Sequence, residues 1–217
     1  GEHGLRFTIQ GTPIFLDKDV GIDALSHTEK TAGSVWDCSL VLAKYLEKER
    51  DSLLLGRSVL ELGAGQGVVG LACALAGASG VILTDVAAAL PMLNANISIN
   101  KLEGKVRAVE LDWMKARQHA TLLEPADTIV AADTVWVEGL AVPFVRALAL
   151  TAAKRAGVRV LLCHRTRSHR TDDVLFGELK GVGFEWEEVS TAQHDGTFRT
   201  HDVKIFSLTL ANLREHL

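Results

Sequence analysis

The chain has 217 residues, the length of one α/β domain with a substantial core. Hydrophobic residues make up 47% of it and charged residues 23%, which are ordinary values for a globular protein. The formal net charge of −4 excludes a general electrostatic attraction to nucleic acid, so binding a polyanion would need a local basic patch. We expect a single domain over residues 1–217, with an N-terminal elaboration over 1–58 and a core over 59–210.

The cysteines and the hydropathy pattern indicate where the protein works. Cys38, Cys73 and Cys163 lack the spacing of metal ligands and lie in apolar contexts, so we expect buried thiols in a reducing compartment and no metal. No segment has the apolar length needed to cross a membrane. The sequence therefore favours a cytoplasmic protein, with the nucleus as a second location.

The N-terminal segment predicts a β-hairpin followed by a helix. Apolar and polar residues alternate over 5–16 around a turn at Gly11-Thr12, which is the pattern of two short paired strands. Ser34 and Asp37 have the spacing of a capping box, which predicts a helix that begins at Ser34. The polar stretch 21–33 is expected to be a loop near the ligand.

Beyond residue 58, short apolar runs alternate with helical stretches. The runs are rich in branched residues and nearly continuous, as in strands covered on both faces. They lie at 59–62, 81–84, 106–111, 128–132 and 158–163, with helices over 68–76, 88–100 and 139–155 between them. This alternation predicts a doubly wound α/β sheet with right-handed crossovers. After a helix around 172–180, strands over 184–189 and 203–210 predict an antiparallel pair that closes the sheet.

A glycine turn after the first of these strands carries the strongest functional signal. In the run 63–67, Gly63 and Gly65 let a ligand approach the backbone closely. The dinucleotide pattern would need a third glycine at position 68, where the chain has Val68. Glu61 precedes the turn, where a carboxylate would repel a pyrophosphate but accept hydrogen bonds from hydroxyls or hold an ammonium group. The predicted ligand is a ribose joined to an amino acid, which S-adenosylmethionine fits.

Asp85 ends the second of the strands, 22 residues after Gly63. A carboxylate at this place can bind both ribose hydroxyls of a nucleotide-like ligand. The same side chain could cap the helix that follows, and the two roles are compatible.

Several further motifs, in their order along the chain, resemble one enzyme family. They are Trp36-Asp37, Leu60-Glu61-Leu62-Gly63-Ala64-Gly65, Thr84-Asp85, Asn94 and Asn100, Leu111-Asp112-Trp113 and Ala132-Asp133-Thr134-Val135-Trp136. The set is similar to the seven-strand, S-adenosylmethionine-dependent protein-lysine methyltransferases of the METTL21-like group, or methyltransferase family 16. The resemblance covers residues 5 to 210. It implies a Rossmann-like sheet with strand order 3-2-1-4-5-7-6, bound S-adenosylmethionine and methylation of a lysine on a protein.

The resemblance also assigns residues to the cofactor. It places Trp113 against the adenine ring and Trp36 near the methionine end, although either indole could instead be packed in the core. Asp112 could bind the adenine amino group or lie exposed on the surface. The other predicted cofactor contacts are Glu61, Gly63, Ala64, Gly65, Asp85 and Ala132.

Asp133 and Trp136, after the fourth strand of the core, form the predicted catalytic site. Related enzymes have an acidic residue followed three places later by Tyr or Phe. Trp136 has no phenolic oxygen, which argues against a mechanism that needs a tyrosine hydroxyl and leaves room for an altered acceptor pocket. Because a carboxylate stabilises an ammonium group, we assign Asp133 to capture and orientation of the lysine amine rather than to proton abstraction. A purely structural Asp133 is the alternative.

The run His164–Arg170 lies on the rim where substrate should arrive. Five of its seven residues can carry positive charge. It could bind an acidic partner surface, or it could be a solvated loop, which is the usual nature of a charge run.

Two other functions fit the same fold. One is a small-molecule or nucleic-acid methyltransferase, although nucleic-acid amine methylation commonly uses an Asn/Asp-Pro-Pro-aromatic loop that is missing after the fourth strand. The other is a non-catalytic module that binds S-adenosylmethionine or a partner, and Trp136 is its best support. The predicted partner is a protein that presents a lysine, and the predicted state is a monomer.

Overall fold

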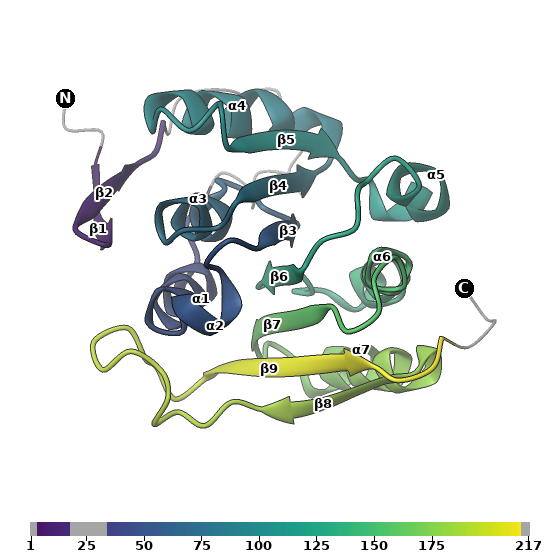
Figure 1. The fold of residues 1–217 in the computed structure, drawn as a ribbon. Helices are drawn as coiled ribbons and strands as arrows, with labels where there is room; N and C mark the ends of the chain where they lie inside the picture. Colours follow the sequence, from purple (N-terminus) through teal and green to yellow (C-terminus); the bar gives the residue numbers. More distant parts are fainter. Residues whose placement is uncertain (1–3, 18–33, 214–217) are drawn as a thin grey trace.

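The computed structural model describes residues 4–17 and 34–213 of the chain. Its centre is a seven-stranded sheet in the order β5-β4-β3-β6-β7-β9-β8 (Figure 1). Counted along the chain from β3, this order reads 3-2-1-4-5-7-6, so the predicted topology is confirmed. The strands are β3 (Ser58–Leu62), β4 (Gly80–Asp85), β5 (Val106–Glu110), β6 (Thr128–Ala132), β7 (Arg159–Arg165), β8 (Phe184–Glu188) and β9 (Val203–Leu210).

The strand pairing places a ligand crevice at one edge of the sheet. The five strands β3 to β7 are parallel, and β9 pairs antiparallel with both β7 and β8. From β3 the chain passes to β4 on one side and later returns to β6 on the other. Such a reversal leaves an open crevice outside the carboxyl ends of the two central strands.

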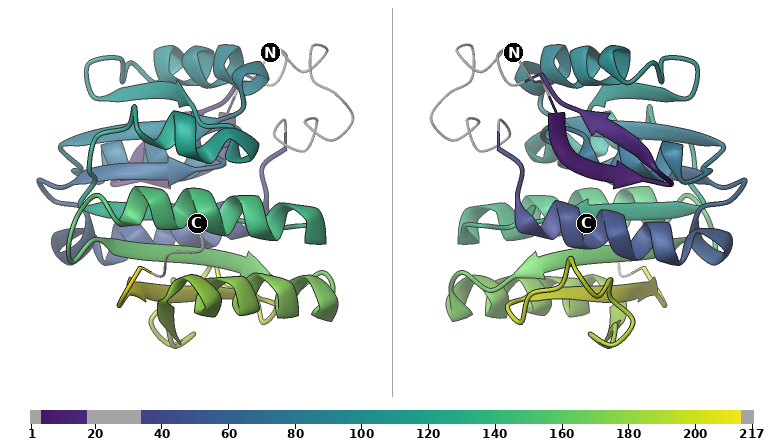
Figure 2. Two further views of the ribbon diagram at one scale, coloured as in Figure 1. Left: turned by 90° about the vertical axis from the view of Figure 1, so that its right-hand side faces the viewer. Right: turned by 90° about the vertical axis from the view of Figure 1, so that its left-hand side faces the viewer.

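Helices cover both faces of the sheet (Figures 1 and 2). One face carries α1 (Asp37–Lys48), α3 (Val68–Leu75) and α4 (Leu90–Ile99), and the other carries α5 (Ala116–Ala120), α6 (Ala141–Ala152) and α7 (His169–Val182). The short helix α2 (Arg50–Leu53) follows α1, and the 3-10 turns η3 (Ala87–Ala89), η4 (Trp113–Lys115) and η5 (Glu138–Leu140) precede α4, α5 and α6. Across the described ranges, no helix combines the length and apolar character that a membrane span requires.

Buried apolar side chains form one cluster on each face of the sheet. The first includes Leu42 and Leu71, from α1 and α3. The second includes Phe144 and Leu148 of α6 together with Leu175 of α7. Because both faces are covered, the central strands are largely apolar, and this is the pattern from which they were predicted.

The predicted hairpin is present as β1 (Gly4–Ile9) and β2 (Thr12–Phe15), which pair antiparallel. Its tight turn lies at Gln10 and Gly11, one residue earlier than expected. Both residues have positive φ (49° and 76°), as a two-residue hairpin turn requires. Asn100 of α4 donates to the carbonyl of Phe15 (2.7 Å) and accepts from its amide (3.0 Å). The hairpin is thereby fastened to α4.

The predicted start of the first helix is wrong by three residues. Helix α1 begins at Asp37, and Trp36 precedes it with an extended backbone and no side-chain cap. The capping box does not form because the Asp37 carboxylate points elsewhere, to Arg165 at 2.9 Å. The loop expected over residues 21–33 lies outside the described residues.

The basic run is also not a loop along its whole length. His164 and Arg165 end β7, while His169 and Arg170 open α7, which starts earlier than the predicted helix around 172–180. The Asp172 side chain stabilises this early start, because it contacts Nε2 of His164 (2.8 Å) and accepts from Thr166 (2.6 Å).

Candidate functional site

A cavity of about 300 Å³ lies at the carboxyl ends of β3, β4 and β6. It is lined by every predicted site residue except Glu61: Trp36, Gly63, Ala64, Gly65, Asp85, Asp112, Trp113, Ala132, Asp133 and Trp136. The topology thus brings together residues that are about 100 positions apart in the sequence, at the crevice where an open α/β sheet binds ligands.

The glycine turn forms the floor of this cavity in a conformation that needs glycine. Gly63 and Gly65 have φ of 66° and 54°, in the left-handed region. A Cβ on Gly63 would lie 2.9 Å from the Trp113 ring and 3.0 Å from Thr134. Bare backbone at Gly63 therefore allows the indole to approach the turn.

Asp85 ends β4 with its carboxylate held by two backbone amides. Oδ2 accepts from Gly65 at 2.8 Å, and Oδ1 accepts from Val86 at 2.8 Å. The carboxylate also lines the cavity. The bond from Gly65 orients the glycine turn, a role that the sequence did not predict, and the bond from Val86 lies just before η3. Binding of ribose hydroxyls and capping of the following helix stay predictions.

Trp113 and Asp112 line the cavity after β5. The half-buried Trp113 ring packs edge-to-face on Phe144 of α6, with centroids 5.2 Å apart. Its Nε1 is buried and has no hydrogen-bond partner within the described part of the chain. Asp112 accepts from the Met114 amide at 3.0 Å and lies 3.4 Å from Nζ of Lys115, so its carboxylate already caps η4. Trp113 therefore provides a flat apolar surface at this end of the cavity.

Glu61 lies behind the turn rather than in the cavity. Alternation along β3 turns it to the α3 side of the sheet, where Oε2 accepts from the Gly70 amide at 2.8 Å. A Cβ on Gly70 would lie 2.8 Å from this oxygen, so glycine permits the close approach of α3. Burial raises the pKa of Glu61 to about 8, and the nearby Asp85 carboxylate adds to the rise. This position supports a role in holding α3 to the sheet, and direct contact with the ligand stays a prediction.

Asp133 stands at the point where β6 ends, with φ of 54°. Asp is one of the few residue types that tolerate this left-handed conformation, which costs other side chains more. Its amide donates to the Cys163 carbonyl at 2.9 Å, which keeps the residue next to β7. The side chain is only 3% exposed. The backbone thus presents a buried carboxylate at the cavity wall.

The carboxylate of Asp133 is paired with Arg167. Nε of Arg167 donates to Oδ1 at 3.4 Å and Nη2 donates to Oδ2 at closer range. The same guanidinium lies 5.0 Å from the centre of the Trp36 ring. A carboxylate and an indole face therefore meet one cation at the cavity wall, the combination by which proteins bind cationic side chains. Trp136, half-buried, lines the same cavity.

Three other basic side chains of the run 164–170 contact carboxylates as well. Arg165 pairs with Asp37 and Asp202, Arg170 pairs with Glu138, and His164 contacts Asp172, while His169 is exposed. The run is therefore neither a free basic patch nor a plain solvated loop. Its charges hold α1, η5 and α7 to the end of β7.

No individual role was predicted from the sequence for two residues that make key contacts in or behind the site, Arg167 and Asn96. The signal for Arg167 was the predicted parallel pairing of β6 with β7, because this pairing brings the residues after both strands together at Asp133. Asn96 of α4 donates from Nδ2 to the carbonyl of Gln66 (2.9 Å) and accepts from the Asp17 amide (2.7 Å). The motif set named Asn94, which is exposed on the same helix.

The sequence is similar to known proteins over most of its length. A family model described as a lysine methyltransferase matches residues 17–182. The protein N-lysine methyltransferase METTL21A of Xenopus tropicalis is 31% identical over 187 residues, which cover 85% of this chain and 80% of the relative. The protein-lysine N-methyltransferase EEF2KMT of Mus musculus is 30% identical over 195 residues, 82% of this chain and 57% of the relative.

The fold is shared with solved methyltransferase structures. The ribosomal protein L11 methylase of Lactobacillus delbrueckii subsp. bulgaricus superposes with a TM-score of 0.56 at 14% identity, covering 79% of this chain and 77% of that one. At this identity the likeness shows the Rossmann-like fold alone. The chain spans about half to three-fifths of the length of the first curated relatives that it matches.

Proposed function

Because the chain belongs to the lysine methyltransferase family, we propose that it transfers a methyl group from S-adenosylmethionine to the side-chain amine of a lysine in a protein substrate. The observation that carries this proposal is a single cavity lined by the glycine turn, Asp85, Trp113 and Asp133. The first three suit an adenosyl group, and the buried carboxylate suits an amine.

The cavity residues fit S-adenosylmethionine. Asp85 lies at the end of β4, where a carboxylate can bind ribose hydroxyls, and Trp113 offers a flat apolar surface for the adenine. Trp36 lines the cavity beside Asp133, near the place assigned to the methionine end. When bound, S-adenosylmethionine supplies a sulfonium methyl group that an amine lone pair accepts, while the electrons of the carbon–sulfur bond return to sulfur as a neutral thioether.

The residues of the chain orient the acceptor amine and exclude water from it. Asp133 can accept a hydrogen bond from the amine, and Trp36 and Trp136 wall the cavity with apolar surface. Positioning of this kind can remove roughly 7–11 kcal/mol of a barrier. The amine must also be neutral, and for a free lysine with a pKa of about 10.4 its deprotonation at pH 7 costs about 4–5 kcal/mol. Desolvation between the two indoles lowers that cost.

Replacement of Asp133 tests the assignment of the acceptor site. We expect Asp133→Asn to abolish methyl transfer, because an amide has one acceptor oxygen and cannot both accept from Arg167 and orient the amine, while S-adenosylhomocysteine binding measured by calorimetry stays within about twofold of the wild type. Asparagine also tolerates the left-handed backbone at this position, so the variant should fold. Equal loss of cofactor-product binding and transfer would remove the acceptor role from Asp133.

The substrate class is tested by incubating the wild-type protein and a cell lysate with methyl-labelled S-adenosylmethionine. We expect label on lysine of a protein band, which mass spectrometry then identifies. Label in RNA or in metabolites would contradict the protein substrate, and absence of label would favour a non-catalytic binding module.

We also propose that the protein acts as a monomer, with one methyltransferase domain over residues 1–217, in the cytoplasm or nucleus. The arrangement of both core clusters around one sheet supports the single domain. Cys38, Cys73 and Cys163 are buried free thiols, which suits a reducing compartment.

A further inference from the structure

Arg167 covers the carboxylate that the proposed reaction uses. Its Nε and Nη2 face the two oxygens of Asp133, and the Asp133 side chain is 3% exposed whereas that of Arg167 is 30% exposed. A guanidinium that bonds both oxygens of a carboxylate makes a strong, oriented pair. At the cavity wall, the negative charge of Asp133 is therefore balanced by the guanidinium of Arg167.

This compensation matters because the acceptor amine must lose a proton, a requirement that rests on the proposed function. A free carboxylate beside an amine raises the pKa of the amine by about 1–3 units and so holds the ammonium form, which has no lone pair. A paired carboxylate still has lone-pair sites for one hydrogen bond from the amine, because Arg167 takes only two of about four. The paired carboxylate of Asp133 can therefore orient the amine by a hydrogen bond without stabilising its ammonium form.

The remaining charged groups around Asp133 leave this balance in place. On β7, α1, η5 and α7 they are Arg165 with Asp37 and Asp202, Arg170 with Glu138, His164 with Asp172, and the exposed His169 at the start of α7. The buried thiol of Cys163, whose pKa burial raises, stays neutral, and Cys38 is its neighbour. Also lining the cavity, Asp85 and Asp112 are held by backbone amides. Within the described residues, Arg167 is the cation bonded to Asp133.

We propose that Arg167 is a positioning residue that cancels the charge of Asp133, so that the site takes the acceptor lysine as the neutral amine instead of trapping the ammonium. It also rests on the face of Trp36, which keeps the guanidinium at the carboxylate.

Two cofactor analogues test this without any protein substrate. S-adenosylhomocysteine is neutral at sulfur, while sinefungin carries a protonated amine in place of the sulfonium methyl. Calorimetry at pH 7.5 gives the ratio of their dissociation constants for the wild type and for Arg167→Met. We expect the preference for sinefungin to rise about tenfold or more in the variant, because an uncompensated Asp133 attracts the ammonium.

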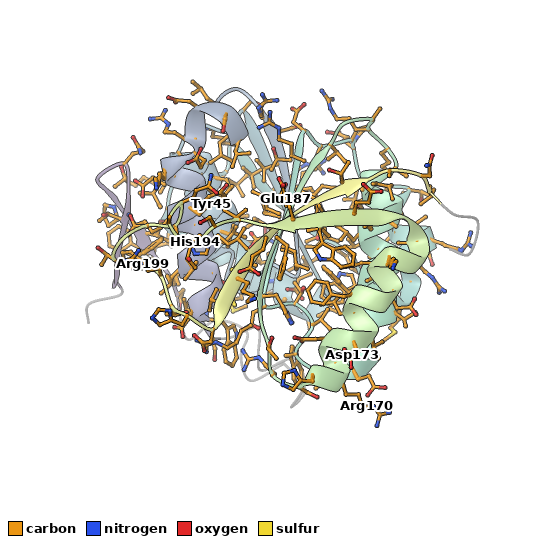
Figure 3. The ribbon with its side chains drawn as sticks, turned by 90° about the horizontal axis from the view of Figure 1, so that it is seen from below. Tyr45, Arg170, Asp173, Glu187, His194 and Arg199 are labelled. Carbon is orange, nitrogen blue, oxygen red and sulfur yellow. The ribbon has the colours of Figure 1, made fainter. Side chains whose placement is uncertain are left out.

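The controls separate charge from structure. Arg170→Met removes a nearby cation that does not contact Asp133, since Arg170 lies in the first turn of α7 (Figure 3) and pairs with Glu138. The ratio of the two dissociation constants for this variant should equal that of the wild type. Arg167→Lys should restore the wild-type ratio, and Asp133→Asn combined with Arg167→Met should abolish the gain. Equal weakening of both analogues by Arg167→Met, or an unchanged ratio, would overturn the inference. Failure of the wild type to bind either analogue would instead overturn the proposed function.

Discussion

Glu61 is a residue whose environment makes the stability of the whole fold depend on pH. Its pKa is about 8 in the folded protein, mainly because of burial, against an ordinary value of 4.5. The folded state therefore holds a proton that the unfolded chain releases between these values. The resulting stabilisation is fully present below about pH 4.5 and is lost as the pH rises toward 8.

We expect Glu61→Gln to flatten this part of the stability profile. Glutamine keeps an acceptor for the Gly70 amide but carries no proton to release. Chemical denaturation at several pH values should show the wild type losing up to about 1.4 kcal/mol per pH unit relative to the variant between pH 5 and 8. Glu185→Gln, at an exposed site on β8, should follow the wild type. Parallel profiles for all three proteins would contradict a protonated Glu61.

Single residues were predictable where local geometry alone decides. The positive φ of Gly63 and Gly65 and the strand-end positions of Asp85 and Asp133 follow from motif spacing. The pairing of Arg167 with Asp133 does not, because the partners are 34 positions apart and meet only through the pairing of β6 with β7. The strand alternation with Leu60 and Leu62 predicts that Glu61 faces the opposite side of β3 from them, whereas its motif neighbours favoured a ligand contact.

At the scale of elements, α4 connects the N-terminal segment to the glycine turn. Asn96 is fully buried and joins the Gln66 carbonyl to the Asp17 amide, and Asn100 joins the same helix to β2. Gln66 lines the cavity. The position of the turn is therefore coupled to the packing of the hairpin.

Alanine substitutions on α4 test this coupling with a matched pair. Asn96→Ala leaves buried polar groups without this partner, at a cost of about 1–3 kcal/mol for each group. We expect a lower free energy of unfolding and weaker binding of S-adenosylhomocysteine. Asn94→Ala, two residues away and exposed, should change the stability by about 0.5 kcal/mol or less. Similar effects of the two substitutions would contradict the role given to Asn96.

The elements themselves were predictable because the hydrophobic pattern matches the burial of each strand and helix. The boundaries that failed are those set by side chains from elsewhere in the chain. Helix α1 starts late because Asp37 pairs with Arg165, and α7 starts early because Asp172 binds back to His164. Near the other end of α1, the ring of the buried His194 packs edge-to-face on Tyr45, with centroids 6.1 Å apart (Figure 3).

At the scale of the whole molecule, the strand order explains why the site exists. β4 and β6 lie on opposite sides of β3, so their carboxyl ends bring Asp85 and Asp133 to the same cavity. One face of the sheet contributes Trp36 from the start of α1, and the other contributes Trp113, supported by Phe144 of α6. The cavity thus depends on both core layers and on the order 3-2-1-4-5-7-6.

The central claim is that this cavity binds the adenosyl part of S-adenosylmethionine through Asp85, and calorimetric titration with S-adenosylhomocysteine tests it most directly. We expect saturable one-to-one binding by the wild type. We expect a loss of tenfold or more in Asp85→Ala, because hydrogen bonds to a charged acceptor contribute about 1.5–3 kcal/mol. Asp173→Ala, exposed on α7, should bind as the wild type does (Figure 3). Absence of binding, or equal affinity in the Asp85 variant, would show that the cavity does not hold the adenosyl group through Asp85.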